Sequence, residues 1–128
     1  MPNGQDAISE HSHPRFWKFY RTPGGAREAF DYIMSRPEKD RAKIVAAMED
    51  VVTYGKEASR HVRDDVYEVR VSGKDVTYRI FYATEGRYNQ VLLAVHAVAK
   101  KTQKARDHDI DEAMRRLKDW RSRAKPGK

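Results

Sequence analysis

The sequence contains no cysteine and none of the motifs of the commoner enzyme classes. Without cysteine, a disulfide framework, a zinc site with thiolate ligands and a cysteine nucleophile are all excluded. The chain also lacks a glycine-rich phosphate loop, the nucleophile elbow of serine hydrolases and the histidine spacing of zinc proteases. His11 and His13 stand near the N-terminus without a third candidate ligand. We therefore expect neither a metal site nor a cofactor.

A long hydrophobic run is missing as well. No window has the length of a transmembrane helix or the pattern of a signal peptide, so we expect a cytoplasmic protein without membrane contact. The 128 residues suffice for one domain whose core can fold alone. We expect this domain over residues 15–124, after a polar, disordered leader over residues 1–14 and before a frayed tail over residues 125–128.

Positive charge is in excess and unevenly spread. The net charge of +7 arises from 26 basic and 19 acidic residues. Residues 91–128 hold eleven of the basic and five of the acidic residues, and therefore most of the excess. A basic surface favours a polyanion such as nucleic acid, or else an acidic protein partner. Solubility alone also explains charge on a C-terminal helix and tail.

The first third of the chain predicts a strand and two helices. Residues 16–21 are aromatic and short, as in a strand. Thr22 and Pro23 are typical of a helix start, which predicts a helix to about Ser35. Ser35 and Glu38 have the spacing of a capping box, and the second helix should stop at Gly55. Helices joined this tightly form an antiparallel hairpin that lies on a sheet.

Three strands and a last helix follow a charged loop at residues 56–65. Residues 67–71 and 76–82 alternate between apolar and polar side chains, and residues 91–99 form a buried strand. Sequential strands with short turns give an antiparallel meander. The predicted fold is therefore α+β, with an antiparallel sheet of about four strands, an N-terminal helical hairpin and a C-terminal helix from about Asp107. That helix has an apolar stripe (Ile110, Ala113, Met114, Leu117, Trp120) that should dock on the sheet or the hairpin, and a basic side (Arg115, Arg116, Lys118, Arg121) that should face nucleic acid or an acidic protein partner.

The strand at residues 91–99 leads directly into a basic segment. Lys100, Lys101 and Lys104 follow it without an intervening acid, and Arg106 comes next. Cations at the end of a buried strand are a natural site for a phosphate backbone. A solvated loop before the last helix is the alternative.

A second group of charges lies on the preceding hairpin. If the hairpin turns on Gly73 and Lys74, Glu68 lies opposite Arg79, with Arg70 one diagonal step away on the same face. These side chains then form either a solvent-exposed cross-strand ion pair of small energy or a rigidly held cation near the lysines after Ala99.

Arginine, lysine, scattered histidine and tyrosine are sufficient to cut RNA. The 2′-hydroxyl of RNA is a built-in nucleophile. A protein therefore has only to orient it, stabilise the charge of the crowded phosphorane and move protons. Such an enzyme needs no metal ion.

Several segments together resemble the RelE/HigB superfamily of type II toxin–antitoxin toxins, in its phage-derived, host-killing HigB-like branch. They are Tyr67-Glu68-Val69-Arg70, Tyr78-Arg79-Ile80-Phe81-Tyr82, His96, Lys100-Lys101-Thr102-Gln103-Lys104, and the last helix with Ile110, Ala113, Arg116 and Leu117. The resemblance extends from about Phe16 to Trp120. It implies a small antiparallel sheet against a helical hairpin, ribosome-dependent mRNA cleavage, and a helix-turn-helix antitoxin as partner.

The resemblance also implies site residues. Arg79 matches the strand arginine that contacts the scissile phosphate, Lys101 the basic residue after the last core strand, and Arg70 the arginine of the preceding strand. His61 lies on the loop where some relatives place a catalytic histidine, while His96 is either catalytic or a core residue. Further RNA contacts are expected from Lys100, Lys104, Arg63, Arg106 and Arg116. The chain departs from the family pattern in having no tyrosine near Asp107 and in Val98, where an aromatic is usual.

Two other functions remain open at this point. A ParE-like toxin has the same fold and blocks gyrase without cutting RNA, and a phage nucleic-acid-binding module has no toxic activity. ParE-like proteins lack the cation cluster, so Arg79 together with Lys101 favours cleavage. Ribosome, mRNA and antitoxin are then the expected partners.

Overall fold

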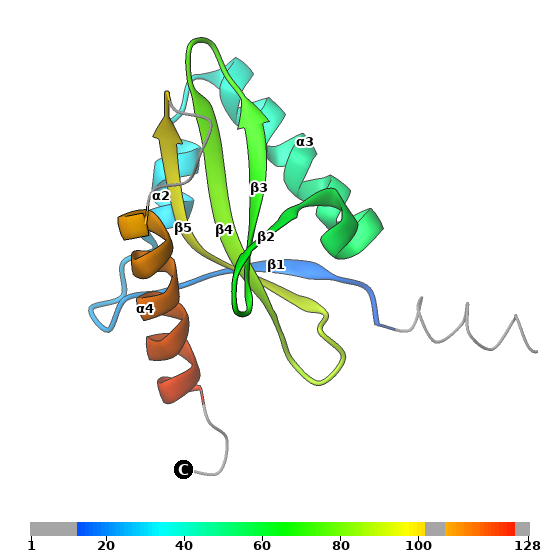
Figure 1. The fold of residues 1–128 in the computed structure, drawn as a ribbon, viewed down its shortest axis with the longest axis vertical. Coiled ribbons are helices and arrows are strands. Elements are labelled where there is room, and N and C mark those ends of the chain that lie inside the picture. The colour runs from blue at the N-terminus through cyan, green and yellow to red at the C-terminus, as the bar shows by residue number, and fades with distance from the viewer. Residues whose placement is uncertain (1–12, 102–106, 125–128) are drawn as a thin grey trace, which may run out of the picture.

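The computed structural model describes residues 13–101 and 107–124 and has a five-stranded sheet at its centre (Figure 1). The elements in chain order are β1 (Phe16–Phe19), α2 (Glu28–Met34), α3 (Glu38–Tyr54), the 3₁₀ helix η1 (Gly55–Ala58), β2 (Arg60–Arg63), β3 (Val66–Ser72), β4 (Thr77–Glu85), β5 (Val91–Lys100) and α4 (Asp107–Arg123). The predicted α+β class, helical hairpin and C-terminal helix are confirmed. Nearly all of the predicted leader and tail, with Lys104 and Arg106, lies outside the described residues. No helix in the described part of the chain is both long and apolar enough to cross a membrane.

The sheet has the strand order β1-β5-β4-β3-β2. Strands β3, β4 and β5 form the predicted antiparallel meander. Strand β1 adds to β5 in parallel, with Phe16 beside Val91. As an internal strand, β5 buries Leu92, Leu93 and Val95 completely, which explains why its sequence is apolar except for His96 and the terminal Lys100.

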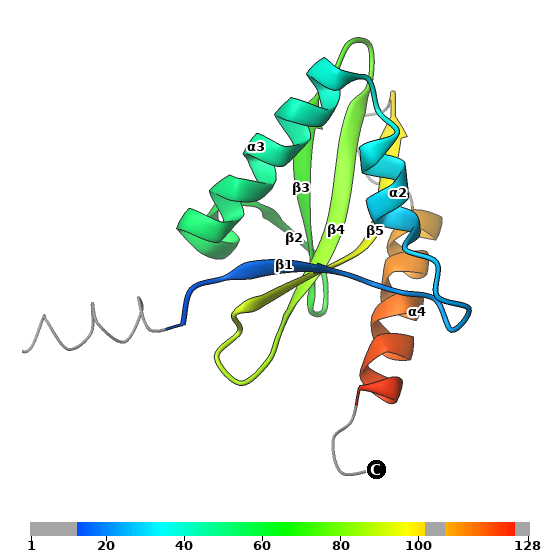
Figure 2. The ribbon, with the colours of Figure 1, turned by 180° about the vertical axis from the view of Figure 1, so that it is seen from behind.

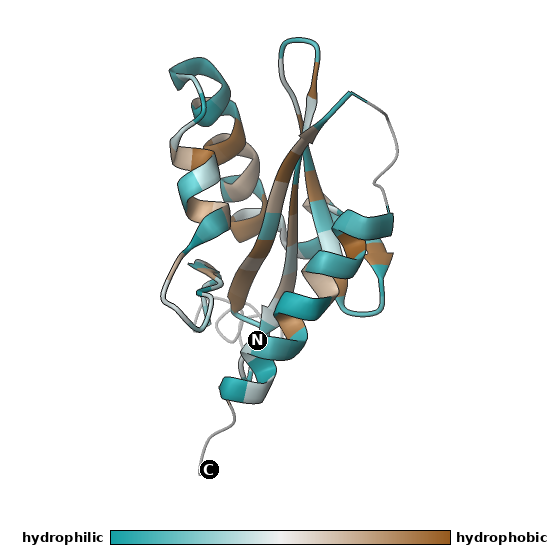
Figure 3. Cartoon of the chain, turned by 90° about the vertical axis from the view of Figure 1, so that its left-hand side faces the viewer, coloured by the Kyte–Doolittle hydropathy of each residue, from teal (hydrophilic) through white to brown (hydrophobic). Residues whose placement is uncertain are grey.

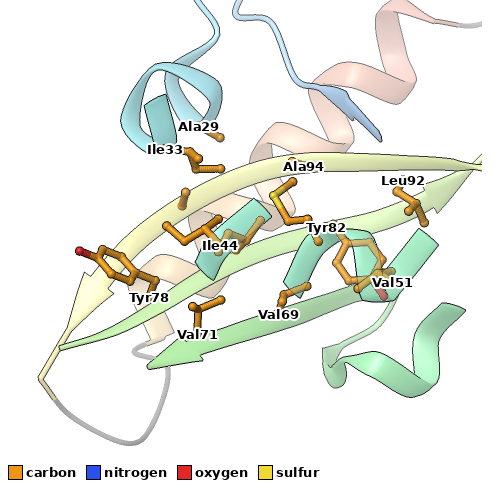
Figure 4. Packing of buried hydrophobic residues seen from close by; sticks show 13 residues of the cluster. Ala29, Ile33, Ile44, Val51, Val69, Val71, Tyr78, Tyr82, Leu92 and Ala94 are labelled. Carbon is orange, nitrogen blue, oxygen red and sulfur yellow. The ribbon is translucent and has the colours of Figure 1, made fainter. Parts of the chain in front are cut away.

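Helices α2 and α3 cover one face of the sheet (Figure 2). Ile33, Ile44 and Val51 pack against side chains of β3, β4 and β5, and Figure 4 shows this cluster between helices and strands. Ile44 and Val51 are fully buried. Burying an aliphatic side chain of this size stabilises the fold by about 1.5–3 kcal/mol.

Helix α4 covers the opposite face, as the side view in Figure 3 shows. Ile110, Ala113 and Leu117 are buried against Phe81, Leu93 and other strand residues, with Met114 and Trp120 at the margin. The apolar stripe of α4 therefore docks on the sheet, as its spacing predicts.

The first helix begins later than the sequence suggests. Thr22 starts a turn in which its Oγ1 accepts a hydrogen bond from the Ala26 amide at 3.1 Å. Gly25 adopts a φ of 97°, and helix α2 starts only at Glu28. Two consecutive glycines disfavour a helix, so the signal of Thr22 and Pro23 marks a turn instead.

The boundary between α2 and α3 also differs in detail. Ser35 donates its hydroxyl to the Tyr32 carbonyl at 2.8 Å, and Pro37 takes the N-cap position of α3, so no capping box forms. Gly55 ends α3 with a φ of 71°, as predicted, and a Cβ there would lie 2.8 Å from the Arg15 guanidinium.

Strand β2 lies within a segment predicted to be a loop. Residues 60–63 pair with β3 in an antiparallel ladder, with Arg60 opposite Glu68. The sheet therefore has five strands rather than about four. An edge strand with charged side chains resists pairing with other molecules, and it lacks the apolar alternation by which a strand is recognised.

The β3–β4 hairpin turns one residue later than predicted. The Gly73 amide donates to the Val76 carbonyl at 2.9 Å, so the turn is Lys74-Asp75, and Asp75 takes the positive φ of 65°. Arg70, not Glu68, therefore lies directly opposite Arg79. This moves the pairing by two residues, so each side chain stays on its predicted face.

Candidate functional site

The candidate site lies on the face of the sheet that α4 covers in part. Arg79 on β4 is opposite Arg70 on β3 and Val98 on β5, and Lys100 is opposite Thr77. Alternation along β4 places Arg79 on the same face as Phe81, which packs against α4. The sheet thus brings Arg70, Arg79 and Lys100 to one face, as the sequence predicts.

Arg79 is a buried arginine. Its Nη1 donates to both carboxylate oxygens of Glu68, at 2.9 and 3.1 Å. The exposed fractions of the two side chains are 1% and 4%. The Glu68–Arg79 ion pair is therefore not exposed to solvent, and the Arg79 guanidinium does not reach solvent either. Its geometry holds the guanidinium rigidly and also makes it part of the fold.

Arg70 differs from Arg79 in exposure. It lies directly across the ladder from Arg79 and is half-buried. Like charges opposite each other on a sheet are unfavourable unless an acid is near, and Glu68, two residues along β3, supplies that acid. Of the two arginines, Arg70 is the one with surface toward solvent.

A β-bulge in β5 turns His96 toward the same face. Phe81 is opposite His96 while Tyr82 is opposite Ala94, which leaves Val95 as the extra residue. Bulges of this kind redirect side chains. The His96 ring stacks on Phe81 with 5.8 Å between centroids. His96 is thus one diagonal step from Arg79 across the β4–β5 ladder.

Asp109 connects His96 to Lys100. Its carboxylate lies 3.1 Å from His96 Nε2, 3.1 Å from Lys100 Nζ and 3.5 Å from His108 Nε2. The Asp109 side chain is only 5% exposed. The first turn of α4 therefore delivers a buried acid to the end of β5. Within residues 13–101 and 107–124, no three histidine or acidic side chains are arranged to hold a metal ion.

These contacts determine the protonation states of His96 and Asp109. Burial lowers the pKa of His96, helped by Arg116, and this outweighs the opposing effect of the hydrogen bond that His96 donates to Asp109. Burial raises the pKa of Asp109, but the hydrogen bonds of His96 and Lys100 outweigh it and the net pKa is lowered. At neutral pH a neutral imidazole thus lies beside a carboxylate. This network assigns the proton to Nε2, which donates to Asp109, and leaves Nδ1 as an acceptor.

His61 does not join this group. It pairs with Tyr67 on β3 and contacts that ring edge-on at 5.1 Å. Tyr67 packs with the α2–α3 cluster, so His61 belongs to the opposite face from Arg79. Its Nε2 lies 2.6 Å from the Asp64 carbonyl oxygen.

Two cations expected to bind RNA instead anchor α4. Arg63 pairs with Asp111 at 2.6 Å. Arg116 is buried beneath the helix, where it donates to the Val95 carbonyl at 2.9 Å and to Glu112 at 2.7 Å and also pairs with Glu28. The predicted basic outer side of α4 is therefore wrong for Arg116. Lys101 follows β5 directly and is exposed.

Asp109 was not among the predicted site residues. In the sequence it reads as an acid at a helix start, where it suits the helix dipole. One signal was available, because Asp109 precedes Ala113 by four residues and therefore lies on the buried stripe of α4.

The chain matches known proteins in two ways. Residues 31–118, more than half of the chain, match the family described as phage-derived protein Gp49-like. Among solved structures, a doubly substituted mutant of the E. coli toxin RelE in its free state is similar, with a TM-score of 0.58 and 16% identity over 81% of this chain and 98% of that chain. At this identity the likeness shows the fold alone. No curated protein matches the sequence.

Proposed function

The chain belongs to the phage-derived Gp49-like family, a RelE/HigB-type toxin family, and from this premise we propose that this toxin is a ribosome-dependent endoribonuclease that cuts mRNA and arrests translation. One observation carries the proposal. Arg70, Arg79 and Lys100 share a sheet face with a neutral histidine, and exposed Lys101 follows at the strand end. Phosphate recognition and proton transfer then have side chains in one place.

The proposed reaction uses the 2′-hydroxyl of the RNA. His96 Nδ1 accepts the hydroxyl proton, the 2′-oxygen attacks the adjacent phosphorus, and the bond from phosphorus to the 5′-oxygen breaks. The Lys100 ammonium gives a proton to the leaving 5′-oxygen, which yields a 2′,3′-cyclic phosphate and a 5′-hydroxyl. In this scheme His96 replaces His61, which lies on the other face.

The cations have different roles in this scheme. Arg70 and Lys101 have surface toward solvent and would contact the phosphates. Arg79 is buried, so it would act as a fixed positive charge beneath the site rather than as a direct ligand. A preorganised charge in a site of low dielectric stabilises developing negative charge without reorganising.

The partners follow from the same proposal. A toxin of this family has an antitoxin partner, and we propose one of the helix-turn-helix type. Ribosome and mRNA are the proposed target, which sets the place of action in the cytoplasm.

Induction in bacteria followed by primer extension on mRNA tests the function. We expect cuts within translated codons for the wild type and a loss of about 10²-fold or more in cleavage for Arg70→Gln. Arg87→Gln is the matched control, because Arg87 is exposed on the β4–β5 loop, away from the Lys100 end of β5. DNA-damage signalling without mRNA cuts would instead indicate gyrase inhibition, and the absence of both would indicate a binding module.

A further inference from the structure

We propose that Asp109 is a positioning residue, which orients His96 as the base and holds Lys100 as the acid of the cleavage reaction. This inference rests on the proposed nuclease function. It adds a residue on α4 to a site whose other members lie on β3, β4 and β5 and in the residue that follows β5.

The geometry of Asp109 supports a positioning role. One carboxylate oxygen lies 3.1 Å from His96 Nε2 and the other 3.1 Å from Lys100 Nζ. The carboxylate thus accepts a hydrogen bond from His96 Nε2. This fixes the tautomer in which Nδ1 is free of a proton and can accept one. With a side chain only 5% exposed, Asp109 itself has little surface for substrate.

Because Asp109 is buried, its carboxylate depends on the side chains that surround it. A buried carboxylate is stabilised by donors and by opposite charge; Asp109 Oδ1 is within hydrogen-bond distance of His96 Nε2, and Oδ2 forms an ion pair with the Lys100 ammonium. Lys100 is 22% exposed and His96 15%, so both have surface from which to reach a bound RNA. One acid therefore links two side chains that perform opposite proton transfers.

The charged groups that surround His96 determine how its pKa responds to a substitution. Helix α4 presents Asp109, Arg116 and Glu112 to the imidazole, and Arg79 on β4 is a diagonal neighbour. Lys100 acts through the shared carboxylate. Replacing Asp109 with asparagine keeps the size and an acceptor oxygen but removes the negative charge that favours the imidazolium of His96.

The test is the pH profile of kcat/KM for mRNA cleavage on purified translating ribosomes. For Asp109→Asn we expect kcat to fall on the order of 10²-fold with KM little changed. The acidic limb of the profile, which His96 sets, should move to lower pH, because His96 loses a negative charge that favours its imidazolium. Asp109→Glu should recover part of the rate. Asp107→Asn, an exposed acid in the same helical turn, should leave the profile in place.

A purely structural role for Asp109 gives a different result. It would reduce the rate at every pH by one factor without moving the acidic limb, and that outcome overturns the proposal. Nitrogen NMR of His96 gives an independent readout. The wild type should carry its proton on Nε2, and equal populations of the two tautomers would also overturn the proposal. A wild type that cuts no mRNA on ribosomes refutes the nuclease function, whereas normal cleavage with an unshifted Asp109→Asn profile refutes only the role of Asp109.

Discussion

Arg70 lies directly opposite Arg79 on the neighbouring strand, and Glu68, the acid two residues before Arg70, forms a buried ion pair with Arg79. One guanidinium is thereby fixed inside the protein, while the other is half-buried on the same face. The two arginines are close in space but differ in what a substitution would reveal. Removing Arg79 disturbs the fold, whereas removing Arg70 tests contact with substrate.

The first prediction concerns the stability of the Glu68–Arg79 pair. Arg79→Met leaves a buried carboxylate without its cation, and we expect a loss of about 3–5 kcal/mol in the free energy of unfolding. The double variant Glu68→Leu with Arg79→Met removes both charges and should recover much of that loss. Urea unfolding of the four proteins measures the coupling.

Additive effects of these two substitutions would show that the pair contributes nothing to stability. Because Arg79→Met is expected to destabilise the fold, loss of toxicity in this variant alone does not identify a catalytic residue. A folded double variant that is still inactive would assign Arg79 a functional charge as well.

The second prediction concerns Arg116 as an anchor of α4. Arg116→Met removes donors to the Val95 carbonyl, Glu112 and Glu28 at a buried position, so we expect a loss on the order of 3 kcal/mol in unfolding free energy. Arg115→Met, one residue away on the same helix, is exposed and should have no measurable effect. Thermal or urea unfolding compares the two. Equal stability of both variants would contradict the anchoring role.

Much of the fold was predictable because local pattern decides it. The alternation in β3 and β4, the apolar run of β5 and the stripe of α4 each identify an element and its buried face. The register of the hairpin was not predictable to the residue. It depends on whether Gly73 or Asp75 takes the positive φ, and aspartate tolerates that conformation well enough to compete with glycine.

Other features depend on tertiary contacts that the sequence does not display. Strand β2 exists because β3 offers a free edge, and residues 60–63 show no alternation of their own. Asp109 and Arg116 are charged residues whose burial follows only from how α4 docks. His96 reaches the candidate site through a bulge at Val95, which shifts its face by one residue. For these reasons the sequence indicates the strand positions of Arg70 and Arg79 more readily than the buried groups that contact the candidate site.

The third prediction concerns stability in acid. The pKa of His96 is lowered in the folded protein, so below a pH of about 6.5 the unfolded chain binds more protons at this residue. Stability should therefore decrease as the pH falls through this range. The lowered pKa of Asp109 adds a second loss at lower pH, where its carboxylate becomes protonated in the unfolded chain. Urea midpoints across a pH series should show both losses.

The variant His96→Gln separates these two contributions. It cannot titrate, so the loss near neutral pH should shrink while the loss at lower pH remains. The same decrease near neutral pH in wild type and variant would assign that step to another group.

The last prediction concerns which surface contacts ribosomal RNA. The outer side of α4 is less basic than its sequence suggests, because Arg116 is buried, Arg121 pairs with Glu85 at 2.6 Å, and Arg115 pairs with Glu112 at 2.5 Å. The sheet face that carries Arg70, together with the exposed Lys101 directly after β5, is therefore the better candidate. Each lost phosphate contact should lower the salt slope of binding by roughly 0.7 to 0.9.

Ribosome co-sedimentation over a salt series distinguishes the two surfaces. Arg70→Gln with Lys101→Gln should reduce the slope by the amount expected for two contacts, whereas Arg115→Gln with Lys118→Gln should leave it near the wild-type value. The two double variants remove the same nominal charge, so a difference between them reports position rather than net charge. If the helix variant shows the smaller slope and the sheet variant matches the wild type, RNA binds along α4, and the sheet face does not contact the ribosome.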